Sequence, residues 1–182
     1  WGKAEDWWIE RAKAGQGEGY LCGDGKVHQF VFDMRDSEST VERAGQVAAE
    51  LITDHKVDLL MASGHADIVN AVADQSEALK CPCLANLIRW QPFVVRRGGG
   101  PDRPFQWTFA HAAGVEDAVA NYIAMWQQAA TNRRVGVLVP DDADGADMSD
   151  PEGPLLVSAN AAGFECQVLA PYAVGTDDFA TH

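Results

Sequence analysis

The sequence predicts an α/β fold, a parallel sheet with helices on both of its faces. Short apolar runs alternate with amphipathic helix patterns along the chain, an order typical of parallel sheets. Hydrophobic residues make up 47% of the 182 residues, which suits a packed core. The clearest unit is 57–90, where two apolar runs at 57–62 and 83–88 flank a helix pattern. A crossover of this length joins parallel strands.

The first third of the chain predicts two helices separated by a strand. A helix is expected over 4–14 because Gly15 follows it, and glycine is common just past a helix end. Residues 16–26 are glycine-rich and predict a loop or tight hairpin, and 27–34 predict a strand. Ser39 and Glu42 have the spacing of a capping box, which predicts a helix that begins after Ser39.

The elements after residue 95 follow the same alternation. The Gly and Pro content of 96–103 predicts a surface loop, and the alternating aromatic residues of 104–111 predict a half-buried strand. An apolar stripe then predicts a helix over 115–126, followed by a strand over 134–140.

The last third predicts a loop, a helix and a strand. The acidic stretch 141–147 fails as a calcium loop because prolines occupy two positions that should be ligands, so a solvated loop is predicted there. A helix capped by Ser149, with Pro151 in its first turn, is expected to end at Gly163. A final strand is expected over 164–169.

Composition excludes several functions. The net charge of −13 disfavours nucleic-acid binding, and no apolar run is long enough to span a bilayer. No glycine-rich nucleotide motif follows a strand, so no cofactor is expected. The four cysteines predict small buried thiols rather than a zinc site, and their disulfide pairing stays open: Cys22, Cys81, Cys83 and Cys166.

The turn Ser63-Gly64-His65 is the first candidate site. It follows the strand at 57–62, and open parallel sheets bind ligands at the carboxyl ends of their strands. The helix after it would offer N–H groups to an anion. A hydrolase is not favoured, because the nucleophile-elbow pattern is absent and Asp67 is the only acid nearby in the sequence. No catalytic residue is therefore expected.

Several segments together resemble a known family. They are FVFDMRDSESTVERAGQVAAELITDHKVDLL, the stretch 57–90, PFQWTFAHAAGVEDAVANYI, VGVLVPDDADG and YAVGTDDF. Their order resembles the type I periplasmic solute-binding proteins of ABC transporters, in the branched-chain amino acid-binding class. The resemblance implies a fragment, with 1–111 as a first lobe lacking its first strand and 112–182 as the start of a truncated second lobe.

The resemblance also implies a ligand held between two lobes that close by a hinge. The contacts it implies come from these positions: Ser63, Gly64, His65, Ala66, Ala85, Asn86, Leu87, Trp90 and Asp144. Family members often carry Tyr-Gly where this chain has Asp144-Gly145. An aspartate there would meet a cation or hydroxyls, which makes an ordinary branched-chain amino acid less favoured.

The function implied is an extracytoplasmic solute-binding protein, not an enzyme, that delivers a small amino acid, amide or carboxylate to an ABC transporter permease. The alternative is a ligand-sensing domain of the same fold in a regulator or receptor, and an α/β hydrolase using His65 is a weaker third. The expected location is periplasmic, or extracellular with a lipid anchor, although this sequence contains no export signal. Open sheet edges predict self-association of the fragment.

Overall fold

The computed structural model describes residues 2–15, 17 and 19–179. The chain divides into two compact units, one reaching to Arg35 and the other beginning at Asp36.

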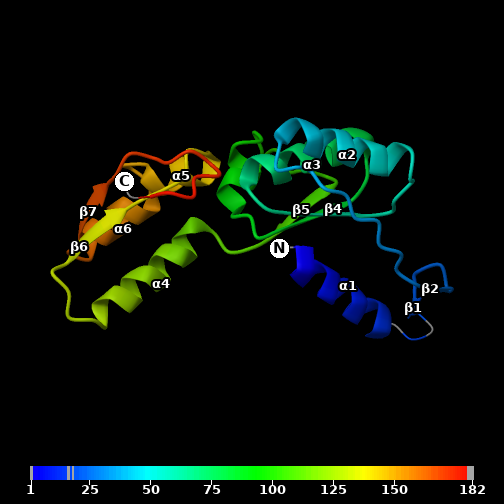
Figure 1. Cartoon of the computed structure of the whole chain (residues 1–182), viewed down its shortest axis with the longest axis horizontal. Coiled ribbons are helices and arrows are strands. Elements are labelled where there is room, and N and C mark those ends of the chain that lie inside the picture. The colour runs from blue at the N-terminus through cyan, green and yellow to red at the C-terminus, as the bar shows by residue number, and fades with distance from the viewer. Residues whose placement is uncertain (1, 16, 18, 180–182) are drawn as a thin grey trace. The chain divides into compact units, whose positions relative to one another are not determined.

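The first unit contains one helix and a short hairpin. Helix α1 (Gly2–Gly15) confirms the helix expected at 4–14. Strands β1 (Tyr20–Leu21) and β2 (Val27–His28) pair antiparallel, which agrees with a tight hairpin (Figure 1). The strand expected over 27–34 is wrong beyond His28. A strand needs a neighbour for its backbone N–H and C=O groups, and β1 supplies one only for Val27–His28.

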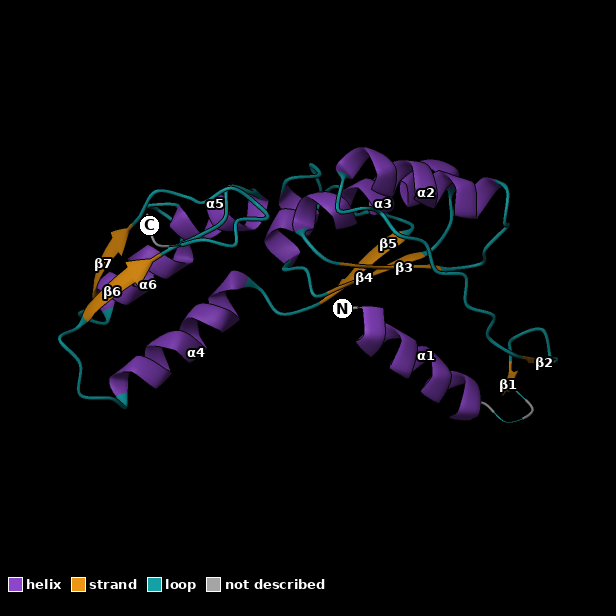
Figure 2. Cartoon of the chain, viewed as in Figure 1, coloured by secondary structure: helices purple, strands orange, loops and turns teal. Residues whose placement is uncertain are grey.

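The second unit begins with a three-stranded parallel sheet. Its elements are α2 (Val41–Thr53), β3 (Leu60–Ser63), α3 (Ala66–Leu79), β4 (Cys83–Asn86), the π-helix η1 (Gln91–Val95) and β5 (Thr108–His111). The sheet order is β3-β4-β5, and both pairs are parallel (Figure 2). The strand–helix–strand unit expected at 57–90 is therefore confirmed.

Helix α2 begins one residue later than the sequence pattern predicts. Its N-cap is Thr40, whose hydroxyl accepts a hydrogen bond from the Arg43 N–H at 3.3 Å. Ser39, the expected cap, instead has a φ of 53°, a left-handed conformation. Either hydroxyl can satisfy a free N–H at a helix start, so the pattern locates the helix but not the capping residue.

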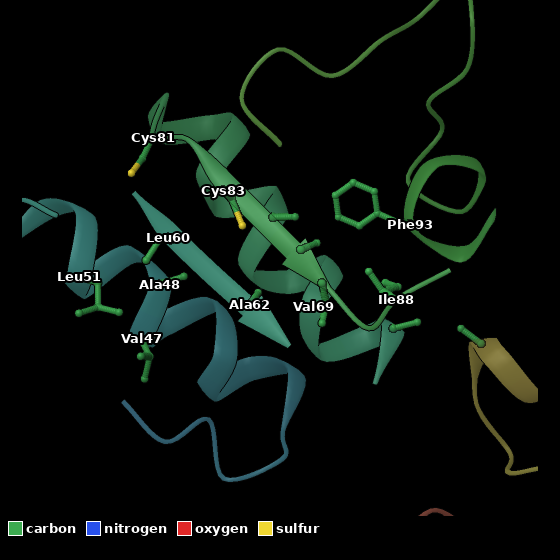
Figure 3. Close-up of a cluster of buried hydrophobic side chains, with 14 residues drawn as sticks. Val47, Ala48, Leu51, Leu60, Ala62, Val69, Cys81, Cys83, Ile88 and Phe93 are labelled. Atoms are coloured by element: carbon green, nitrogen blue, oxygen red, sulfur yellow. The ribbon is translucent and has the colours of Figure 1, made fainter. Parts of the chain in front are cut away.

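One face of the three-stranded sheet forms the larger core. Val47, Ala48 and Leu51 of α2 pack with Leu60 and Ala62 of β3, as Figure 3 shows. Strand residues between the buried ones point to the opposite face. On that face Met61 and Phe109 are exposed, whereas α2 and α3 pack against the other face.

The remaining elements surround a smaller core. They are α4 (Val115–Gln127), β6 (Arg134–Val137), α5 (Ala143–Ser149), α6 (Pro154–Ala161) and β7 (Glu165–Val168), with β6 and β7 paired parallel. Val119, Val137 and Leu155 lie in this second cluster. The mixed α/β class with parallel sheets is thus confirmed, while the division into lobes at residue 111 stays a prediction.

Two expectations about 141–153 are wrong. The acidic stretch forms the short helix α5 rather than a loop, because the Asp142 carboxylate caps it by accepting from the Gly145 N–H at 2.8 Å. Ser149 is the last residue of α5 and does not start the next helix. Helix α6 begins at Pro154, with Gly153 as its N-cap.

The carboxylate of Glu77 joins α3 to the start of β5. It accepts hydrogen bonds from the N–H groups of Trp107 at 2.8 Å and Thr108 at 2.9 Å, from the Thr108 hydroxyl at 3.0 Å, and from the Gln106 N–H at 3.3 Å. Partial burial raises the pKa of this carboxyl, but the four hydrogen bonds outweigh burial and hold the pKa below the ordinary value of 4.5.

Glu77 is therefore expected to make stability depend on pH in acid. Its pKa is lower in the folded chain than in the unfolded one, so its contribution is complete above pH 4.5 and is lost as the pH falls through the folded-state pKa. Urea unfolding from about pH 6 to about pH 3 should show a steeper loss of stability in the wild type than in Glu77→Gln. Equal slopes for the two proteins would contradict this role.

The cysteines only partly match the expectation of buried thiols. Cys81 and Cys83 are buried, Cys166 is half-buried and Cys22 is exposed, and all are free. Burial raises the pKa of the Cys81 and Cys83 thiols, which makes them poor nucleophiles and metal ligands.

Candidate functional site

Polar side chains meet at the carboxyl edge of the three-stranded sheet. Ser63 pairs in register with Asn86, and Asn86 with His111. Residues paired across parallel strands point to the same face of a sheet, so the three form a row. His111 was not among the expected site residues. Its position at the end of the alternating segment 104–111 is the sequence signal that could have identified it.

The turn after β3 depends on a glycine. Gly64 has a φ of 140°, a backbone conformation that residues with a Cβ rarely adopt. The space around it is open, so the backbone angle and not crowding favours glycine here. His65 is the N-cap residue of α3, but its side chain makes no capping hydrogen bond. Instead, its imidazole Nδ1 lies 3.2 Å from an Asp142 carboxylate oxygen.

A cavity of about 610 Å³ lies beside this turn, within the second unit. Ligand sites typically measure roughly 300–1,000 Å³. Three of the expected residues line it, namely His65, Leu87 and Asp144. The other six do not: Ser63, Gly64, Ala66, Ala85, Asn86 and Trp90. Ala66 and Ala85 are fully buried in the larger core.

One ion pair and one histidine–carboxylate contact lie on the lining of this cavity. In the ion pair, the Arg89 guanidinium donates to the Asp144 carboxylate at 2.7 Å, and both side chains stay partly exposed, at 30% and 25%. The other contact joins His65 to Asp142, whose side chain is only 7% exposed. Asp142 is the acid near His65 that the sequence did not reveal, because it lies 77 residues further along the chain.

An aromatic and apolar wall completes the cavity. Tyr122 and Trp126 of α4 lie on it. Their rings are stacked, with 6.0 Å between the ring centres and an angle of 18° between the ring planes. Met148 and Leu155 add apolar surface. From the sequence, the apolar stripe of α4 predicts a helix but does not indicate a cavity. Trp126 does pack against the smaller core, but the same side chain also faces the cavity.

Trp90 lies outside the lining of this cavity and contacts the start of α4. Its indole N–H donates to the Glu116 carboxylate at 2.8 Å, and the Gln91 amide donates to the other oxygen of that carboxylate. The Trp90 bond is the main reason that the pKa of Glu116 is lowered. The side-chain amide oxygen of Gln91 in turn accepts a hydrogen bond from the Val115 N–H at 3.1 Å. Trp90 and Gln91 thus anchor the start of α4.

A second hollow, of about 580 Å³, lies between α2 and α3. Its lining includes Glu42, Asp67 and Asp74. The 610 Å³ cavity is the better candidate, because its lining combines the Arg89 guanidinium with two carboxylates and two aromatic rings near strand ends. Open α/β sheets bind their ligands at such ends.

Among residues 2–15, 17 and 19–179, no three His, Cys, Asp or Glu side chains gather as a metal site. A hydrogen bond between Ser63 and His65, which nucleophilic catalysis would use, is likewise absent from the described contacts. No described helix has both the length and the apolar character to cross a membrane.

A family model described as periplasmic binding protein matches residues 1–182. No curated protein matches the chain. Solved structures similar to it include a solute-binding protein of an ABC transporter from Rhodopseudomonas palustris HaA2, in complex with p-hydroxybenzoic acid. It is 19% identical with a TM-score of 0.72, and the match covers 95% of this chain and 43% of that one.

Two further structures have the same fold. A solute-binding protein from Rhodopseudomonas palustris BisB5, in complex with 3,4-dihydroxybenzoic acid, is 20% identical with a TM-score of 0.69, over 99% of this chain and 45% of that one. A leucine-binding protein from Thermotoga maritima MSB8 is 15% identical with a TM-score of 0.61, and the match covers 80% of this chain and 39% of that one. The chain spans less than half the length of each of these structures.

Proposed function

This chain belongs to the periplasmic binding protein family, and we propose that it forms part of an ABC-transporter solute-binding protein that holds a small carboxylate-bearing ligand. The family is extracytoplasmic and non-enzymatic. The proposed partner is a membrane permease, and the proposed location is the periplasm or the outer surface of a cell, with or without a lipid anchor.

The observation that carries the proposal is the composition of the 610 Å³ cavity. It combines one guanidinium, from Arg89, with the stacked rings of Tyr122 and Trp126. A largely apolar pocket with a few convergent polar groups is typical of small-molecule sites. A guanidinium recognises carboxylates through charge-assisted hydrogen bonds.

The ligand class is supported by chemistry shared with similar structures. Two of them are described as complexes with hydroxylated benzoic acids and one as a leucine-binding protein. These ligands share a carboxylate attached to an apolar body. We therefore propose an amino acid or a related small carboxylate as the ligand. Amides that also carry a carboxylate belong to the proposed class.

The proposed lobes are 1–111 and 112–182. In their favour, the larger core draws its buried residues from 47–93, with Ala143 as the exception, and the smaller core draws them from 115–156. The cavity is lined by Leu87 and Arg89 from the first of these ranges and by Val137 and Leu155 from the second. Closure of such lobes around a ligand is the hinge motion that this architecture permits. Within these ranges, Ser63, Gly64, Ala66, Asn86 and the other expected contacts stay proposals.

A thermal-shift screen tests the ligand class. Because a ligand that binds only the folded state raises its melting temperature, benzoate, 4-hydroxybenzoate and leucine should each be tested, with glucose and glycerol as uncharged controls. At a concentration of about 100 times its Kd, a ligand contributes about 2.7 kcal/mol of stability. Stabilisation by the sugar alone would contradict the carboxylate class.

The alternative function is a ligand-sensing domain of a regulator or receptor. It uses the same cavity, so the screen does not separate it from transport. The full gene product does: a DNA-binding or receptor segment would favour the sensor. Self-association, expected from open sheet edges, is also a proposal.

A further inference from the structure

We infer that Arg89 is the carboxylate-recognising residue of the cavity, that Asp144 occupies it when no ligand is bound, and that this exchangeable pair selects ligands carrying both a carboxylate and an ammonium group. The inference rests on the proposed function and names the residues and the ligand charge pattern behind it.

Arg89 is the strongest anion-binding group of the cavity. Among the described lining residues it is the only lysine or arginine. It stands just past β4, close to the carboxyl edge of the sheet. Its side chain is 30% exposed, which leaves the guanidinium within reach of a solute.

Asp144 can move away from Arg89 without breaking a helix cap. Asp142 cannot move without losing the hydrogen bond that caps α5. Asp142 caps α5 through the Gly145 N–H at 2.8 Å and also meets His65 at 3.2 Å, and its side chain is 7% exposed. Moving it would expose an unsatisfied helix start. Asp144 lies two residues further on, inside α5, is 25% exposed and caps nothing. Its 2.7 Å hydrogen bond with Arg89 is therefore the ionic contact a ligand can replace.

When a ligand carboxylate takes the place of Asp144 on Arg89, the negative charge of Asp144 loses its partner. A ligand with only a carboxylate would satisfy Arg89 but would leave Asp144 without its cation in a partly buried site, which is unfavourable. A ligand that also carries an ammonium group would pair with both residues. The stacked rings of Tyr122 and Trp126 offer a flat apolar surface to the remainder of the ligand.

A matched set of three probes separates these charges. Phenylalanine carries both groups, 3-phenylpropanoate lacks the ammonium, and 2-phenylethylamine lacks the carboxylate. Calorimetric titration of the full 182-residue chain should give the tightest binding for phenylalanine. In Asp144→Asn the ratio of phenylalanine affinity to 3-phenylpropanoate affinity should fall by about 10- to 100-fold, the range for one charged hydrogen bond.

Two variants complete the test. Arg89→Gln should weaken phenylalanine and 3-phenylpropanoate alike, with Arg89→Lys giving a smaller loss because it keeps the charge. Asp147→Asn is the matched control: Asp147 lies on the same helix and pairs with Arg96 at 3.1 Å, but does not line the cavity. Its affinity ratio should equal that of the wild type. Circular dichroism melting of each variant verifies that it is folded.

The outcomes distinguish the inference from the proposed function. An unchanged ratio in Asp144→Asn, in a protein that still binds carboxylates, overturns the inference and leaves the function standing. Tighter binding of 3-phenylpropanoate than phenylalanine by the wild type also overturns it. A folded wild type that binds neither these probes nor any carboxylate of the thermal-shift screen overturns both.

Discussion

Replacing Phe93 with alanine is expected to destabilise the fold by about 3–5 kcal/mol. The Phe93 side chain is 1% exposed and lies in the larger core. Its ring meets Phe105 edge-on at 6.3 Å, and the Arg97 guanidinium lies 4.7 Å from the ring centre. Truncation would remove these contacts and leave a cavity that rigid neighbours fill only in part.

Chemical denaturation of wild type and Phe93→Ala measures this loss. Phe109→Ala is the matched control, because Phe109 is 55% exposed on the uncovered face of the sheet. Its replacement should change the free energy of unfolding by less than about 1 kcal/mol. A Phe93→Ala loss no larger than that of Phe109→Ala would show that Phe93 is not a core residue in solution.

Glu77→Ala is expected to be the second most destabilising change, by roughly 2–3 kcal/mol. One carboxylate serves three backbone N–H groups and the Thr108 hydroxyl, so its removal leaves several donors without their partner. The effect exceeds that of a single hydrogen bond but stays below the sum of four, since water reaches part of the site. Glu77→Gln should cost less, because the amide keeps one acceptor oxygen.

Glu42→Ala is the control for this loss. Glu42 is an exposed carboxylate on α2 that accepts one hydrogen bond, from the Gln46 side chain at 3.3 Å. Its removal should change stability by no more than about 0.5 kcal/mol. Similar midpoints in urea for Glu42→Ala and Glu77→Ala would mean that the link between α3 and β5 contributes little.

The alternation of strands and helices could be predicted because each element carries its own hydrophobic period. The apolar run before Ser63 and the stripe on α4 depend on local spacing alone. The strand at 27–34 could not be judged this way. Its composition suits a strand, but pairing depends on a neighbour elsewhere in the chain. Helix α5 was missed because it is only seven residues long, too short to show a helical apolar stripe, and because it depends on the Asp142 cap.

Part of the site could be predicted. His65 was expected because it lies just past a predicted strand, and Leu87 and Asp144 because of the family resemblance; all three line the cavity. Arg89 was not expected: its partner Asp144 is 55 residues away, and no local pattern links them. Tyr122 and Trp126 follow a core-like spacing, which conceals that one side of a helix can serve both a core and a cavity.

The contrast between Asp144 and Gly145 has a consequence for how ligand preference can change in evolution or in the laboratory. A Cβ at Gly145 would lie 1.8 Å from the Pro140 carbonyl oxygen, so the backbone admits only glycine there. The adjacent side chain, Asp144, is partly exposed and supports no helix cap. A library that keeps Gly145 and randomises residue 144 would therefore preserve the start of α5 while it changes the charge that faces the cavity.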